Sequence, residues 1–287
     1  MFSLRKHVSP SVLSATLQAT TKMMQAKENI PMFINEDLLS ILEHICHVTQ
    51  KEPQVMAQVA NCVNSLTSVS GYTQAIVKSN VVQLLVDNIS TNSTCLPLVK
   101  NTLTLLTNVS QDTQVIPVFC GPKTMKAIVQ ATEVNYNNKE VLDLAATALR
   151  TYSTDEDIYS ALQSNVVVTP EFADSVAKLS SLMLIEENVP KVVSNNGINL
   201  LLYAVKAAAT EEPTEVSTKI LVSSLRALSR SCIDEKKIYA VMQAGGVTAF
   251  LSTLSTHGQN VDVTISALQA LESMITRPEN VEFLLRC

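Results

Sequence analysis

Glu43, His44, Cys46 and His47 form the one cluster in the sequence whose residue types suit a metal ion. His44 and His47 are three residues apart, so on a helix they share one face and are placed to chelate. Zinc needs two more protein ligands, or one ligand and a water, and no other residue stands at a spacing that supplies them. We therefore interpret the cluster as a helix surface with a buried Cys46, and we expect no metal and no cofactor.

Sequence motifs for phosphate binding and acyl transfer are missing. The chain has no G-x-G-x-x-G, no phosphate-binding loop and no nucleophile elbow, and only four histidines. We therefore expect a protein that is not an enzyme. The rival hypothesis, an enzyme that uses His44 and His47 with a metal, predicts bound metal in the purified protein.

An acidic run, Asp155-Glu156-Asp157, is the second group of residues with a chemical signature. Carboxylates at the start of a helix interact favourably with its dipole and satisfy its free N–H groups. We interpret the run as the N-cap of a helix that begins near Ile158. The alternative is a docking site for a basic partner.

The composition excludes several classes of protein. The chain has 287 residues, 46% of them apolar and 16% charged, with a net charge of −5 and no Trp. This is too apolar for a disordered chain, and the acidic balance argues against a nucleic-acid-binding protein. No stretch reaches about 18 uncharged apolar residues, so we expect no membrane span. Because typical proteins carry about 25% charged residues, the low charge suits a subunit held in a larger assembly.

Residues 1–27 contain basic side chains and no acid, with many Ser and Thr. This composition is typical of a mitochondrial transit peptide. The alternative is a surface helix, in which case residues 1–28 form an N-terminal capping helix. The segment has no apolar signal core, so we do not expect secretion.

Six cysteines are scattered along the chain without a C-x-x-C pair. Such spacing in an apolar sequence indicates reduced core residues. The residues are Cys46, Cys62, Cys95, Cys120, Cys232 and Cys287.

A repeated pattern organises most of the chain. Apolar segments with helical spacing close on an anchor leucine: Leu66-Thr-Ser-Val-Ser70, Leu106-Thr-Asn-Val-Ser110, Leu149-Arg-Thr-Tyr-Ser153, Leu225-Arg-Ala-Leu-Ser229 and Leu271-Glu-Ser-Met-Ile275. The anchors are 40, 43, 76 and 46 residues apart, and the gap of 76 contains a shortened unit with Leu182 as its anchor. A weaker copy ends near Met23. In the last copy, Leu268, Leu271 and Ile275 carry the helical spacing.

A corner recurs between these anchors, where a short helix meets a second apolar run. Two helices that meet at a steep angle need a backbone break, which Gly or Asn at positive φ supplies. The copies contain Ser79-Asn80, Asn195-Asn196-Gly197 and Gly245-Gly246, with looser copies over 33–42 and 118–128. No segment alternates like a strand, so we predict an all-α protein.

A period of about 40–47 residues with two or three helices is typical of armadillo and HEAT solenoids. The Gln-Ala-Gly-Gly-Val corner at 243–247 and the Leu-Thr-Asn-Val-Ser close at 106–110 resemble the armadillo variety. The resemblance implies a right-handed α-solenoid of about six repeats over 29–277. The units are 29–70, 71–110, 111–154, 155–186 (degenerate), 187–231 and 232–277, followed by 278–287 as a capping helix or truncated repeat. The alternative is one fused all-α globular domain.

The resemblance also implies a concave groove, lined by the last helix of each unit, that binds extended peptides. Relative to each anchor, the groove of importin-α holds Trp two residues before and Asn two residues after, and the groove of β-catenin is basic. Among the positions six before, two before and two after the anchors, we take as candidates Asn64, Ser68, Lys100, Thr104, Asn108, Thr147, Thr151, Lys219, Ser223, Gln269 and Ser273.

Only Asn108 matches the importin-α pattern, and without Trp the stacking platform for a basic side chain is missing. The lining is mixed rather than basic. We expect Asn64 and Asn108 to bind a peptide backbone through their amides; the alternative is a solvated face.

These features predict a non-enzymatic protein–protein interaction scaffold in the cytoplasm. Its sharper form is a structural subunit of a stable assembly, for example a ciliary or cytoskeletal one, and this rests on analogy with the fold. The alternative is an adaptor that binds extended peptides reversibly in its groove. A mitochondrial location fits either function.

Overall fold

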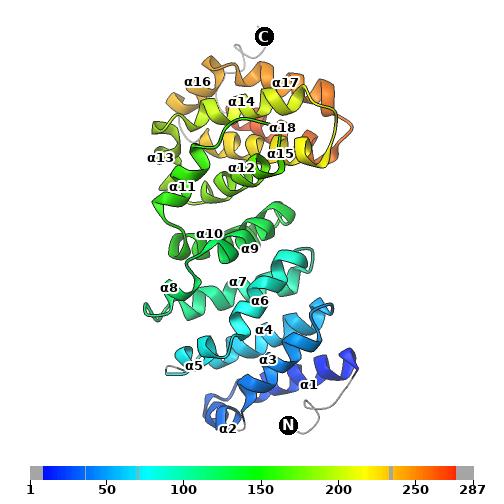
Figure 1. Ribbon diagram of the computed structural model, residues 1–287, viewed down its shortest axis with the longest axis vertical. Helices are drawn as coiled ribbons and strands as arrows, with labels where there is room; N and C mark the ends of the chain where they lie inside the picture. Colours follow the sequence, from blue (N-terminus) through cyan, green and yellow to red (C-terminus); the bar gives the residue numbers. More distant parts are fainter. Residues whose placement is uncertain (1–8, 36, 70, 233–234, 276–287) are drawn as a thin grey trace. The chain divides into compact units, whose positions relative to one another are not determined.

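The computed structural model describes residues 9–35, 37–69, 71–232 and 235–275 of the chain (Figure 1). Within these residues the regular structure consists of helices, without a strand. The prediction of an all-α protein is confirmed. Cys287 and the predicted C-terminal segment 278–287 lie outside the described residues.

The chain divides into two compact units, unit 1 over Met1–Ser153 and unit 2 over Thr154–Cys287. This division falls next to the predicted boundary between the repeats 111–154 and 155–186. Each unit is a stack of helices that follow one another along the chain.

The described residues of unit 1 form ten α-helices and one 3-10 helix: α1 (Pro10–Met23), the 3-10 helix η2 (Lys27–Asn29), α2 (Ile30–Asn35), α3 (Leu38–Val48), α4 (Pro53–Thr67), α5 (Thr73–Lys78), α6 (Val81–Thr91), α7 (Leu96–Val109), α8 (Ile116–Phe119), α9 (Pro122–Val134) and α10 (Lys139–Tyr152). The helices α4, α7 and α10, which end the predicted repeats, and α1, which precedes them, are here called closing helices. Each packs against the next, and α3, α6 and α9 form a second row of the same kind (Figure 1).

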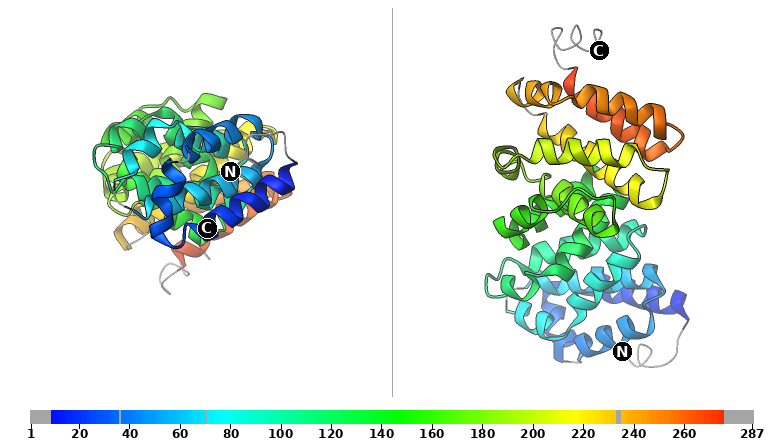
Figure 2. Two further views of the ribbon diagram at one scale, coloured as in Figure 1. Left: turned by 90° about the horizontal axis from the view of Figure 1, so that it is seen from below. Right: turned by 45° about the horizontal axis from the view of Figure 1, so that its top comes forward.

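Unit 2 contains α11 (Asp155–Leu162), α12 (Pro170–Leu182), α13 (Asn188–Ser194), α14 (Gly197–Ala209), α15 (Glu215–Ser231), α16 (Glu235–Gln243), α17 (Gly246–His257) and α18 (Val261–Met274). Its closing helices are α12, α15 and α18, and α15 packs against both of the others. Helix α14, which is yellow-green in Figure 2, packs on α17, which is orange.

The predicted corners lie where the short helix of a repeat meets the next helix. The residue before that helix has a left-handed backbone in four repeats: Asp37 (φ 60°), Asn80 (φ 57°), Asn196 (φ 64°) and Gly245 (φ 85°). Asn, Asp and Gly tolerate this conformation best. The residue after the corner in two of these repeats is Gly197 or Gly246, where a Cβ atom would lie 2.7 or 2.8 Å from a carbonyl oxygen of the preceding helix. Glycine therefore lets the two helices approach closely.

The anchors Leu66, Leu106, Leu149, Leu182 and Leu225 are fully buried, as expected for core positions. The register predicted for the last repeat is wrong, because Leu268 is 52% exposed and Ile275 is 47% exposed. The buried residues of α18 are Val263, Ser266, Ala267, Ala270 and Met274, so Ala270 takes the anchor position instead of Leu271. Both faces of this helix are apolar at the same period, and the face with small residues is the one that packs against its neighbours.

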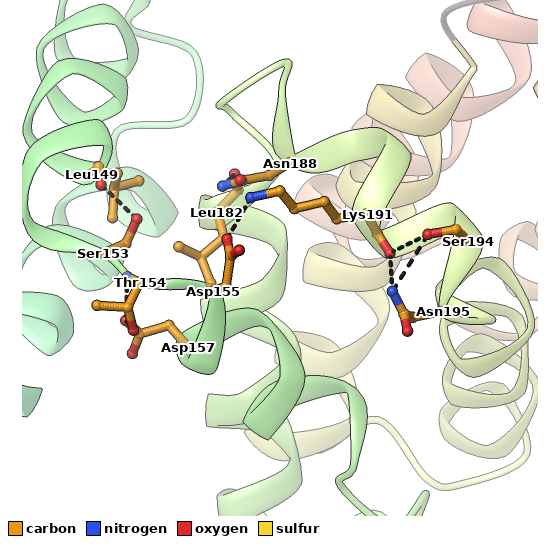
Figure 3. Close-up of polar contacts among 10 residues, drawn as sticks. All are labelled: Leu149, Ser153, Thr154, Asp155, Asp157, Leu182, Asn188, Lys191, Ser194 and Asn195. Carbon is orange, nitrogen blue, oxygen red and sulfur yellow. Dashed lines mark hydrogen bonds and ion pairs between the residues drawn. The ribbon is translucent and has the colours of Figure 1, made fainter.

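The acidic run stands in the first turn of α11, as the capping interpretation requires. The helix begins at Asp155 rather than near Ile158, and Thr154 is its N-cap. The carboxylate of Asp157 accepts a hydrogen bond from the backbone N–H of Thr154 at 2.8 Å and pairs with the Lys178 ammonium at 2.7 Å. Asp155 pairs with Lys191 (Figure 3). Asp155 and Asp157, two of the three acids, thus form ion pairs with lysines of unit 2.

No single helix among the described residues is long and apolar enough to cross a membrane. In the part of the chain that the structure describes, one pair of helices, α16 and α17, reaches that length and composition when taken together, and the pair is bent by 62° where the helices meet.

Candidate functional site

The main candidate site is a cavity of about 850 Å³ in unit 1, at the C-terminal ends of α4 and α7. It brings together three of the predicted groove residues, Asn64, Ser68 and Asn108. Its other lining residues, which the sequence analysis did not single out, are Thr67, Gly71, Thr73, Gln74, Gln111 and Asp112. We call this cavity the amide pocket.

Helix ends create the amide pocket. Helix α4 ends at Thr67 and α7 at Val109, so the last carbonyl groups of both helices lie beside it. The chain leaves α4 through Gly71, whose φ of 102° favours glycine. A helix C-terminus carries a partial negative charge, and Asp112 adds a full one. Among the described lining residues none is basic, so the pocket favours cationic groups and hydrogen-bond donors.

Amide side chains join the two helices inside the pocket. Asn108 Nδ2 donates to Asn64 Oδ1 at 3.1 Å, and Asn64 Nδ2 donates to the carbonyl of Asn101 at 2.8 Å. Asn101 Nδ2 in turn donates to the carbonyl of Ala57 at 3.0 Å. Asn64 and Asn108, the predicted peptide-binding pair, therefore use some of their hydrogen-bonding groups to link α4 to α7. An amide has two donors and an acceptor oxygen, which leaves the Asn108 oxygen and one N–H of each amide for a ligand.

The pocket rim is fixed by further hydrogen bonds. Gln74 Nε2 donates to Gln114 Oε1 at 2.9 Å, and the Gln114 N–H donates to Asp112 Oδ1 at 3.1 Å. Ser68 Oγ donates to the carbonyl of Ser65 at 2.7 Å, an intrahelical contact that leaves its oxygen as an acceptor. These contacts hold Asp112 in place beside the opening.

Of the remaining groove candidates in unit 1, Lys100 pairs with Glu140 across the joint between α7 and α10. Thr104 is half-buried on α7. Thr147 and Thr151 lie along α10 and donate to the carbonyl four residues earlier, at 2.9 and 3.3 Å. None of the four lines the amide pocket.

The candidates in unit 2 do not form a corresponding site. Ser223 is fully buried, so it cannot face a partner, and Lys219 pairs with Asp174. Gln269 is exposed and Ser273 is half-buried, and both were chosen from the wrong anchor. Counted from Ala270, the positions two before and two after the anchor are Leu268 and Glu272.

The His44–His47 cluster lies on α3, with both histidines exposed and Cys46 fully buried between them. Burial raises the pKa of the Cys46 thiol to about 12, with a smaller contribution from the charge of Glu43. The described residues contain no group of three or more His, Cys, Asp or Glu side chains placed to hold a metal ion.

The described cysteines are all free thiols. Cys46, Cys62 and Cys95 are core residues, as predicted, and burial raises the pKa of Cys62 to about 12 as well. The prediction is wrong for Cys120, which is exposed because it lies in the corner between α8 and α9. Cys232 is partly exposed.

No protein-family model matches the chain, and a search of curated proteins found no match either. The candidate site therefore rests on the geometry and chemistry of its own residues.

Proposed function

We propose that this chain is a protein–protein interaction scaffold of the armadillo type, and that unit 1 binds a segment of a protein partner in the amide pocket. The observation that carries the proposal is the pocket itself, which collects amides, hydroxyls and one carboxylate between two closing helices. Side-chain amides there can pair with the backbone of an extended peptide.

The negative charge at the amide pocket favours one class of ligand over others. Helix C-termini and Asp112 favour a donor-rich group, and the described lining supplies no positive charge that would attract an acid. The partner segment should therefore present a Lys or Arg side chain, or the N–H groups of its own backbone, to the pocket. This differs from an acidic-peptide groove, in which basic residues line the helices.

A structural subunit of a stable assembly, for example a ciliary or cytoskeletal one in the cytoplasm, is the sharper form of this proposal. Large apolar side chains that are more than half exposed support it, among them Met32, Val48, Val118, Tyr203 and Tyr239. The charged fraction of 16% is also low for a protein that stays alone in solution. The alternative form is a reversible adaptor, which the open amide pocket favours.

The pocket is tested by selecting peptides from a random display library against the full chain and measuring their affinity by calorimetry. Asp112→Asn removes the charge but keeps an oxygen that can accept from Gln114, and we expect it to weaken a basic peptide by about tenfold. Asn108→Ala should also weaken binding. Lys78→Ala is the control, because Lys78 is exposed on α5 and does not line the pocket. Equal effects of Asn108→Ala and Lys78→Ala would exclude the pocket as the binding site.

The two forms of the scaffold are separated by purifying the tagged chain from its native cells, followed by size-exclusion chromatography and mass spectrometry. One large complex that resists salt supports the structural subunit. A monomer with many weak, salt-sensitive partners supports the adaptor.

A further inference from the structure

A second cavity in unit 1 lies at the C-terminal ends of α3 and α6. It measures about 600 Å³, and its lining includes Lys51 from the loop after α3 and Asp87 from the last turns of α6. No described residue of α3 or α6 lines the amide pocket, so the two cavities are separate. We call the cavity at the ends of α3 and α6 the charged pocket.

The position of one hydrogen bond between repeats explains why the charged pocket is open. Asn135, the C-cap residue of α9, donates from Nδ2 to the Ser93 carbonyl of the preceding repeat at 2.8 Å. Asn92, the C-cap residue of α6, instead donates to Asn88 Oδ1 at 3.2 Å, and Asn88 Nδ2 donates to the Gln50 carbonyl at 2.9 Å. The contact with the preceding repeat is therefore made one turn earlier on α6, and the pocket opens between the last turn of this helix and the loop after α3.

Lys51 and Asp87 bring opposite charges to this cavity, and both side chains are exposed. Within the part of the chain that the structure describes, neither of them forms an ion pair. Asp87 Oδ1 accepts a hydrogen bond from Gln83 Nε2 at 2.8 Å, which leaves Oδ2 for a ligand. A ligand with both a base and an acid can pair with both charges, whereas a ligand of one sign leaves one of them without a partner.

The rest of the lining favours a polypeptide over a small organic molecule. Sites for small molecules are lined mainly by apolar and aromatic side chains. Among the described lining residues of the charged pocket, the side chains of low polarity are those of Leu84 and Cys46. The others are amides and a hydroxyl, which pair well with a peptide backbone: Gln50, Asn88, Thr91 and Asn92.

The charged pocket and the amide pocket lie at opposite ends of the helices of unit 1. Short connections, 49–52 and 92–95, join α3 to α4 and α6 to α7, so the helices of each pair run in opposite directions. The charged pocket is therefore beside the N-terminal ends of α4 and α7, and the amide pocket is at their C-terminal ends. Helix α4 has 15 residues and spans about 22 Å, so ligands in the two pockets do not compete for space.

We propose that the charged pocket binds a second partner segment, one that carries a basic and an acidic side chain close together, and that unit 1 can thus hold two segments at once. The base pairs with Asp87 and the acid with Lys51. This goes beyond the interaction scaffold proposed above, because it names a second site with its own class of ligand. It does not depend on the amide pocket.

The test selects peptides from a random phage-displayed library against the full chain. Peptides that also bind the double variant Lys51→Gln, Asp87→Asn are removed, because this variant keeps the size of both side chains and loses both charges. The peptides that remain should contain a base and an acid. By calorimetry, each single substitution should weaken such a peptide by about tenfold.

Changes in the peptide show which charge meets which residue. Replacing the acid of the peptide with its amide should abolish the effect of Lys51→Gln, and replacing its base with Gln should abolish the effect of Asp87→Asn. Lys126→Gln on α9 and Asp143→Asn on α10 are the matched controls, because both residues are exposed and line neither pocket. Circular dichroism confirms that each variant folds.

Simultaneous binding is measured with the same peptide and one selected for the amide pocket. Saturating the chain with either peptide should change the affinity for the other by less than about twofold. Asp112→Asn should leave the charged-pocket peptide unaffected, because Asp112 lines the amide pocket.

Three results would overturn the proposal. The first is a selection that yields no peptide dependent on Lys51 and Asp87. The second is a set of peptides with charges of one sign. The third is a peptide that Asp112→Asn weakens as much as Lys51→Gln does, which would place it in the amide pocket. Failure of the amide pocket to bind a peptide would leave the charged pocket unaffected, so the two proposals fail separately.

Discussion

In unit 1, side-chain amides link α4 to α7 across the contact between these two helices. In unit 2, small residues line the corresponding contact between α12 and α15. Asn64, two residues before its anchor, is half-buried and lines a cavity of about 850 Å³. The corresponding residue of α12 is Ser180, which is fully buried. Its backbone carbonyl and hydroxyl accept hydrogen bonds from Arg230 Nη1 at 2.6 and 2.8 Å.

This difference shows how one position of a repeated unit decides whether a joint is open or closed. A larger amide keeps part of the joint polar and exposed, and the pocket forms beside it. Small residues, Ala173, Ala177 and Ser180, leave the same face of α12 buried. Unit 1 therefore offers a site for a ligand at this joint, and unit 2 offers a packed core at the corresponding joint.

The largest expected effect tests what the two units share, namely their leucine anchors. Leu106→Ala in unit 1 and Leu225→Ala in unit 2 should each lower the free energy of unfolding by about 2–5 kcal/mol, because each leaves a cavity at a fully buried position. Leu268→Ala, at an exposed position, should change it by less than about 0.5 kcal/mol. Urea denaturation measures all three. A change within about 0.5 kcal/mol for Leu106→Ala would show that the repeat register is wrong.

The second-largest effect distinguishes the contact between α4 and α7 from the contact between α12 and α15. Arg230→Met removes the charged donor to the buried Ser180 and should cost about 2–3 kcal/mol of unfolding free energy, whereas Asn64→Ala should cost about 1 kcal/mol because water can reach its partners. Denaturant midpoints of the two variants give the comparison. Equal costs would mean that the open and closed joints do not differ in energy.

A smaller effect concerns the start of unit 2. Burial raises the pKa of Asp157, but its hydrogen bonds to Lys178 and Thr154 outweigh this, and the net pKa lies below the ordinary value. A lowered pKa in the fold means that ionised Asp157 stabilises it fully above the ordinary carboxylate pKa, and that this stability is lost as pH falls through the folded value.

Asp157→Asn should thus lower stability at neutral pH by less than about 1 kcal/mol, since the pair is partly exposed. The difference from wild type should vanish in acid. Thermal unfolding at several pH values measures it, and a difference that grows in acid would contradict the assignment.

The smallest effect has the opposite sign. The hydroxyls of Ser224 in unit 2 and Thr102 in unit 1 are buried without a hydrogen-bond partner. Ser224→Ala and Thr102→Val should stabilise their units by about 0.5 kcal/mol, because each removes an unsatisfied polar group. Calorimetric melting temperatures would detect the change, and a clear loss of stability would indicate that water or another group satisfies these hydroxyls.

Much of the fold could be predicted from local sequence. Asp37, Asn80, Asn196 and Gly245 mark the corners because few residue types accept a left-handed backbone, and that preference is a property of the single residue. The anchors Leu66, Leu106, Leu149, Leu182 and Leu225 follow from apolar spacing, which is equally local. The capping role of Asp157 needs only its position three residues after Thr154.

The candidate site could be predicted only in part. Asn64, Ser68 and Asn108 were found from their distance to an anchor, but the same rule selected Ser223, which is buried. Gln74 and Asp112 were missed because they come after the closing helices, in α5 and in the loop after α7, outside the positions that the rule considers. A polar residue just after a helix end was the signal that could have found Asp112.

The sequence by itself determined the helices, their corners and five of the six anchors, because these depend on backbone preference and on the spacing of apolar residues. Only the tertiary structure decided which face of α18 is buried, since Val261, Ile265 and Leu268 have the same period as Val263, Ala267, Ala270 and Met274. It also decided that Asn64 and Asn108 bind each other. Period alone does not say which side of a helix meets its neighbour, and that choice depends on residue size at positions about 40 residues apart in the chain.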